Sequence, residues 1–118
     1  MDKSLFSYFA RAVGLAGLSK GAPVAITASR LLTDADCGLV LVNSTATAIT
    51  LTVPAGLAPG FNVKIIQAST GIVTIAAGAG ASVSSVSSFV KTSGANSEIG
   101  ISNKAPNGYV LTGSGAIA

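Results

Sequence analysis

Apolar and polar residues alternate through the middle of the chain, over residues 38–77. Ile49, Leu51 and Val53 alternate with threonines, and the same spacing of apolar residues recurs over residues 61–65. Side chains of a strand point alternately to its two faces, so a period of two residues indicates a strand with one buried face. Segments rich in Gly, Pro, Asn and Ser separate these runs, as turns do. The pattern therefore predicts short strands joined by turns.

The same signals predict nine short strands along the chain, beginning near residues 23, 39, 48, 61, 72, 81, 89, 97 and 109. One helical turn is expected over residues 33–38, capped by Thr33 or Asp34 and closed by Gly38. Asn107-Gly108 is a strong hairpin turn. This spacing predicts an all-β fold, an antiparallel sandwich or jelly-roll-like body of about eight to nine strands. We find no convincing internal sequence repeat, only a recurring strand length.

An N-terminal amphipathic helix is predicted to precede this body. At 100° per residue, the apolar side chains of residues 4–16 fall in a stripe about 120° wide, with Ser4, Ser7, Arg11 and Gly14 opposite. We therefore divide the chain into a helical arm, residues 1–22, and a β-sandwich domain, residues 23–118. The stripe consists of Leu5, Phe6, Phe9, Ala12, Val13 and Ala16.

Three roles are open for this arm. It can cover an open end of the sandwich, or it can act as an anchor that docks on a neighbouring subunit. Association with a membrane is the third role, but the polar face has few basic residues for it. The anchor role makes the large apolar residues of the stripe candidate interface residues: Leu5, Phe6, Phe9 and Val13.

The composition points to self-association. Only 9% of the residues are charged, whereas 49% are hydrophobic. Soluble domains usually have about a quarter of charged residues. Such a surface is either rich in Ser and Thr or hidden in an assembly, and we expect both. The formal charge of +3 lies entirely in residues 1–30, without the dense Lys/Arg stripe and interleaved aromatic residues of a nucleic-acid binder.

The residue inventory argues against an enzyme. The chain has no His, which excludes a Ser-His-Asp or Cys-His site, and one cysteine, Cys37, which excludes an internal disulfide and a cysteine zinc cluster. Asp34 and Asp36 form the only close carboxylate pair, and capping of a helical turn explains them better than a metal does. Glu98 is isolated and expected in solvent. We therefore predict no catalytic residue, no metal site and no cofactor.

The run LTDADCGLVLVNSTATAITLTVP…APGFNVKIIQASTGIVTIAAGAG, closing with NGYVLTG, resembles a module of tailed-bacteriophage virion proteins. This module occurs in tail fibres, head fibres and capsid decoration proteins, and the resemblance covers about residues 31–113. The family often has Trp in the last strand where Tyr109 stands, a change of little consequence for packing. The matching elements are Asp36 to Gly38, Ile49 to Pro54, Pro59 to Phe61, Val63 to Gln67, Thr70 to Ile75 and Gly108 to Gly113.

The resemblance implies a structural role in the virion, commonly as a trimer, and supplies no catalytic residues. Because the chain is one module plus an arm, we expect a capsid decoration (cement) or head-fibre protein at the capsid surface. Its expected partners are the major capsid protein and further copies of itself, with no nucleic acid and no membrane. The alternative is a tail-fibre or receptor-binding module, with a recognition surface in the loops Ala55 to Gly60 and Asn103 to Gly108.

Overall fold

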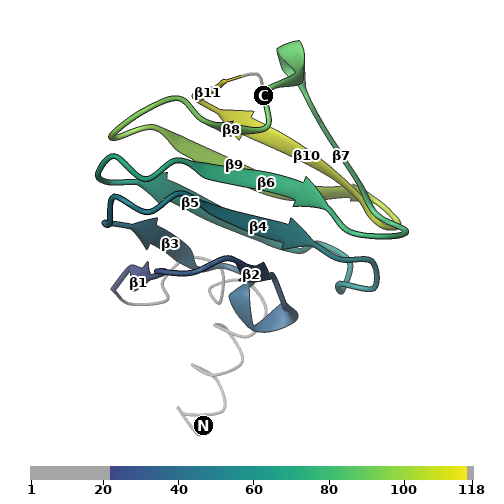
Figure 1. The fold of residues 1–118 in the computed structure, drawn as a ribbon. Helices are drawn as coiled ribbons and strands as arrows, with labels where there is room; N and C mark the ends of the chain where they lie inside the picture. Colours follow the sequence, from purple (N-terminus) through teal and green to yellow (C-terminus); the bar gives the residue numbers. More distant parts are fainter. Residues whose placement is uncertain (1–21, 117–118) are drawn as a thin grey trace, which may run out of the picture.

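The computed structural model describes residues 22–116, which form two β-sheets stacked face to face (Figure 1). One sheet has the strand order β1-β3-β5-β9-β10-β7, and the other has the order β11-β8-β6-β4-β2. The prediction of an all-β fold is confirmed, whereas the predicted helix over residues 4–16 lies outside the described residues. The strands are β1 Val24–Ala25, β2 Arg30–Leu31, β3 Val40–Asn43, β4 Ile49–Val53, β5 Asn62–Gln67, β6 Val73–Ala77, β7 Ser82–Ser85, β8 Lys91–Thr92, β9 Glu98–Ala105, β10 Gly108–Gly113 and β11 Gly115–Ala116.

The first six strands alternate between the two sheets and pair in parallel, so the prediction of an antiparallel sandwich is wrong for this part. β1, β3 and β5 are neighbours in one sheet, and β2, β4 and β6 are neighbours in the other. We call one strand from each sheet, with the corner that joins them, a rung. Rung 1 is β1 and β2, rung 2 is β3 and β4, and rung 3 is β5 and β6. This stacking is the arrangement of a short β-solenoid.

Rungs 2 and 3 form a structural repeat of 24 residues, although the sequence shows no convincing repeat. In one sheet Val40 pairs with Lys64, and in the other Ile49 pairs with Val73. Both pairs are 24 positions apart, and the offset holds along β3 with β5 and along β4 with β6. Equivalent residues have the same orientation, because parallel neighbours in register point to the same face. The repeat preserves the pattern of burial rather than residue identity.

The C-terminal strands break this stacking. β9 pairs antiparallel with β5 and with β10, so the β9–β10 hairpin lies between β5 and β7. The two strands of this hairpin are joined by Pro106 and Asn107, with Asn107 at a φ of 58°. The predicted turn Asn107-Gly108 is thus displaced by one residue, because Gly108 already belongs to β10 and pairs with Ala105. β7 pairs in parallel with β10 and forms the edge of the sheet. In the other sheet β8 is antiparallel to both β6 and β11.

The core lies between the two sheets and is filled by the inward-facing residues of the longer strands. β4 and β6 show strict alternation of buried and half-buried residues over most of their length, as the hydrophobic pattern predicted. Burial of each large apolar side chain is worth roughly 1.5–3 kcal/mol. The residues of the hydrophobic core without any exposed surface are Leu41, Leu51, Val53, Ile65, Val73, Ile99, Ile101 and Tyr109.

The predicted helical turn is present as the 3-10 turn η2, Asp34–Asp36, which leads from rung 1 to rung 2. Thr33 is its N-cap: the Thr33 hydroxyl accepts a hydrogen bond from Ala35 N, and the Asp36 carboxylate accepts one from Thr33 N. Gly38 follows the turn with a φ of 81°, a backbone conformation that favours glycine. The second 3-10 turn, η3 Val86–Ser88, follows β7.

Candidate functional site

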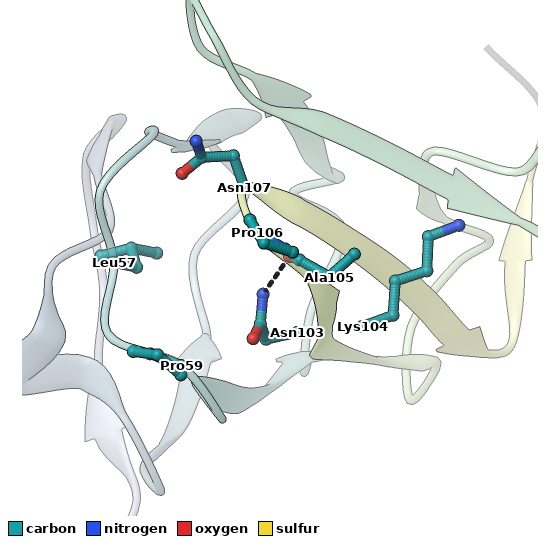
Figure 2. A pocket seen from close by; sticks show the side chains of 7 residues that line it. All are labelled: Leu57, Pro59, Asn103, Lys104, Ala105, Pro106 and Asn107. Carbon is teal, nitrogen blue, oxygen red and sulfur yellow. Dashed lines mark hydrogen bonds between the residues drawn. The ribbon is translucent and has the colours of Figure 1, made fainter.

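A groove of about 320 Å³ lies where the loop between β4 and β5 meets the β9–β10 hairpin (Figure 2). These are the two loops that the sequence analysis identified as a possible recognition surface, Ala55 to Gly60 and Asn103 to Gly108. The structure brings them together, although they are more than 40 residues apart in the chain. The lining residues are Leu57, Pro59, Asn103, Lys104, Ala105, Pro106 and Asn107.

Two asparagine side chains hold the loops together. The Asn107 side-chain oxygen accepts a hydrogen bond from Gly56 N at 2.9 Å, and that of Asn103 accepts one from Gly60 N at 3.0 Å. The Asn103 amide nitrogen donates to the carbonyl of Ala105 at 2.8 Å (Figure 2). These bonds satisfy loop N–H groups that have no partner in a ladder. The two asparagines therefore hold the loops in the positions that form the groove.

The rest of the lining is largely apolar. Leu57 and Pro59 come from the first loop, and Ala105 and Pro106 come from the hairpin. The Lys104 ammonium group, the one ionisable group of the lining, lies at the far side from Leu57 (Figure 2) and donates a hydrogen bond to Ser84 Oγ at 3.0 Å. The groove thus offers apolar surface and the exposed side chain of Asn107 for contact, and its lining has no acid–base pair for catalysis.

The carboxylates that the sequence analysis considered have structural partners. Asp34 Oδ1 accepts a hydrogen bond from Ala58 N at 2.8 Å, which ties η2 to the β4–β5 loop. Glu98 was expected to be isolated, but it forms an ion pair with Lys64 at 3.1 Å, across the β5–β9 pairing. Both side chains of that pair are about half exposed. In residues 22–116 no three His, Cys, Asp or Glu side chains gather at one point.

Asp36 is the most strongly held of these groups. The Arg30 guanidinium donates two hydrogen bonds to its carboxylate, at 2.8 and 2.9 Å, and Thr33 N donates a third. The hydrogen bonds from Arg30 hold the pKa of Asp36 below its usual range, against the opposing effect of burial. The same bonds raise the pKa of Arg30. Asp36 thus acts as a fixed anion that joins β2 to η2.

Two further predictions about site residues have different outcomes. The interface candidates Leu5, Phe6, Phe9 and Val13 lie outside the described residues, so their role stays a prediction. Cys37 is half-buried against the core, close to the expected small buried residue. Among the described residues no helix is long and apolar enough to cross a membrane.

Sequence reasoning missed two buried amides, Asn43 and Gln67. They occupy equivalent positions at the ends of β3 and β5 and are 0% and 1% exposed. From the sequence, Asn43 reads as the first residue of a hairpin turn. The recurrence of an amide side chain after 24 residues is the signal that could have revealed its buried position. No protein-family model matches the chain, and neither does any curated protein.

Proposed function

We propose that the protein is a structural subunit of a tailed-bacteriophage virion, a decoration (cement) or head-fibre protein on the capsid exterior. The proposal rests on the resemblance of residues 31–113 to that module. The observation on the fold that favours it most is that the carboxylates of the described residues, Asp34, Asp36 and Glu98, are all engaged in structural bonds. A protein that presents a stable surface, with no enzymatic activity, fits this use of its acidic groups.

The mechanism of a decoration protein is the burial of surface across subunits. With 9% charged residues, much of the surface can be covered at a small desolvation cost. A stable interface buries about 800 Å² on each partner. Two stacked sheets provide a stiff body for such contacts, with the major capsid protein and with further copies of the chain, a trimer in the first instance.

The test is addition of the purified protein to capsids that lack it. Saturable co-sedimentation, together with a higher temperature of capsid disruption, is the expected result, and electron microscopy of decorated particles should place the protein at symmetry-related positions on the head. Light scattering of the free protein should give the mass of a trimer. Absence from the head in native particles, with no binding to bare capsids, would show the proposal to be wrong.

A tail-fibre or receptor-binding module is the second candidate, because the two predicted recognition loops do form one groove. For this function the protein should bind host cells, and Leu57→Asp should abolish that binding by placing a charge among apolar contacts. Asn62→Asp is a control, since Asn62 is exposed on β5 outside the groove lining. Cell binding that survives Leu57→Asp would exclude the groove as the recognition surface.

A further inference from the structure

The core is partly open at β1, the first strand of rung 1. Val24 in β1 pairs in register with Leu41 of β3, so both side chains face inward between the sheets. Leu41 is 0% exposed, whereas Val24 is 39% exposed. Elsewhere in rung 1, Ile26 and Leu32 are buried, at 5% and 1% exposed. Residues 22–116 thus cover the inner face of rung 2 but leave Val24, at the start of rung 1, partly in solvent.

A hollow of about 370 Å³ lies at this end of the stack. Its lining is continuous in sequence and consists of residues 24–30, which form β1, the corner of rung 1 and the start of β2. Arg30 pairs in register with the buried Leu51, so its stem also lies on the inner face of the sheet while its guanidinium group binds Asp36. The lining of the hollow thus combines apolar side chains, such as Val24 and Ile26, with polar ones. The polar residues are Thr27, Ser29 and Arg30.

An exposed end of this kind requires a cover. In solenoid proteins each rung buries only the faces it shares with its neighbours, and the terminal rung needs a cap with a polar outer side. In Figure 1, β1 and β2 lie at the edge of the two sheets with no further strand beyond them. An inward-pointing charge such as Arg30 discourages the addition of another strand to such an edge. The cover should then be something other than a strand.

The chain itself has a suitable segment next to the hollow. Residues 1–21 immediately precede rung 1, and residues 4–16 have the apolar stripe described above. Thirteen helical residues are about 20 Å long, and a helix about 10 Å wide matches the roughly 10 Å between stacked sheets. Residues 17–21, GLSKG, can span about 16 Å when extended, enough for the segment to turn back over rung 1.

We propose that residues 4–16 form a helix that caps rung 1 of the same chain, with Phe9 and its apolar neighbours over the hollow lined by Val24. Attachment in the same chain is favoured because the short linker gives the segment a high effective concentration at the hollow. The polar face, with Ser7 and Arg11, becomes the outer side of the cap. This role competes with capsid attachment through the same stripe and does not depend on the proposed function.

Hydrogen exchange of the full chain tests the cap. Phe9→Asp should release the segment and lower the protection of amides in residues 24–32 by about tenfold or more, through local opening of rung 1. Ser7→Asp, on the opposite face, should leave that protection unchanged. Amides of β5 serve as the internal control for global folding. Equal protection of rung 1 in wild-type protein and Phe9→Asp would overturn the proposal.

Cross-linking separates the chain's own cap from an exchanged one and also covers the case in which Phe9→Asp unfolds the whole protein. Phe9→Cys and Val24→Cys are combined in a Cys37→Ser background and treated with a short bismaleimide at low protein concentration. A link within one chain is expected, with Ser7→Cys in place of Phe9→Cys as the control that reacts poorly. Links between chains would instead assign the hollow to the arm of a second copy. If no link formed at all, the arm would be free to bind another partner. Links between chains, or no link, would each refute the proposal.

Discussion

Asn43 and Gln67 lie directly one above the other, in register, at the corners of rungs 2 and 3. The Asn43 amide nitrogen donates hydrogen bonds at 3.0 Å to Thr47 O in its own corner and to Gly71 O in the next. Gln67 Oε1 accepts a hydrogen bond from the Thr92 hydroxyl of β8. A column of buried amides thus connects three successive levels of the stack. Buried polar groups that are fully bonded in this way define one register of the rungs.

Asn43→Ala should be strongly destabilising. The substitution leaves Gly71 O and the backbone N–H of Thr45, now bonded to Asn43, without partners in a buried or half-buried corner. Since an unsatisfied buried group costs about 1–3 kcal/mol, we expect a loss of about 2–4 kcal/mol in the free energy of unfolding. Asn62→Ala, at an exposed position, should change it by less than about 0.5 kcal/mol. Urea denaturation of both variants measures the difference, and equal effects would contradict the structural role of Asn43.

Gly71→Ala should be poorly tolerated for a steric reason. A Cβ atom at Gly71 would lie 2.7 Å from Asn43 Nδ2 and from Thr45 O, and closer still to Thr47 O. Backbone oxygens cannot move aside cheaply, so we expect a cost of about 1–3 kcal/mol or more. Gly108→Ala is the matched control, because the nearest atoms there are at 3.6 Å. In thermal unfolding, Gly71→Ala should therefore have a clearly lower Tm than Gly108→Ala.

Tyr109→Phe should stabilise the protein. The Tyr109 hydroxyl is buried and has no hydrogen-bond partner within the described part of the chain, while its ring packs edge-on against Phe61 at 6.3 Å. The substitution keeps the ring contact and removes the unsatisfied hydroxyl, for a gain of about 1 kcal/mol. Thr92→Val is the opposite case, since that buried hydroxyl is bonded to Gln67, and it should destabilise. A loss of stability in Tyr109→Phe would reveal a partner for the hydroxyl.

The same tyrosine predicts a loss of stability in alkali. Burial, with a smaller effect from the charge of Asp34, raises the pKa of Tyr109 in the folded state. Below pH about 10 the phenol is protonated in both folded and unfolded chains, so its pKa has no effect there. Above that pH the unfolded chain releases the proton first, and the free energy of unfolding should fall as the pH rises. Tyr109→Phe should lack this part of the decline.

Asp36 gives the corresponding prediction in acid. Its lowered pKa in the folded state contributes stability above the ordinary aspartate value of about 4, and that contribution is lost as the pH falls through the folded-state value. Arg30→Gln removes the main cause of the shift. The variant should therefore be less stable at pH 7, and its deficit should shrink below pH 4. Lys64→Gln, which removes a half-exposed ion pair, should cost no more than about 1 kcal/mol.

Strand positions could be predicted from the sequence, but strand partners could not. Alternation of apolar and polar residues, as in Ile49–Val53, shows which face of a strand is buried. This pattern is the same whether the neighbouring strands are parallel or antiparallel. Residues 44–48 and 68–72 have the composition of hairpin turns, yet each leads from one sheet to the other. β2 and β11 were missed because two residues are too few to show a period.

The candidate site was predictable only in part. Exposed Gly, Pro and Asn residues marked both loops of the groove as surface loops. Their contact depends on the hydrogen bonds that Gly60 N donates to Asn103 and Gly56 N donates to Asn107, across 43 and 51 positions of the chain. No local pattern encodes such a pairing, because either asparagine reads equally well as a turn residue that bonds only to its own hairpin.

The position of the β9–β10 hairpin between β5 and β7 has a consequence for synthesis on the ribosome. Rungs 2 and 3 have their strands within residues 40–77 and can form as soon as these residues emerge. β7 has no neighbour in its sheet until β10, residues 108–113, has been made. Until residues 98–113 have been made, the edge of β5 and the whole of β7 stay unpaired and open to other chains. On a polysome, neighbouring nascent chains would therefore pair wrongly during this interval of synthesis, before β9 and β10 cover these strands.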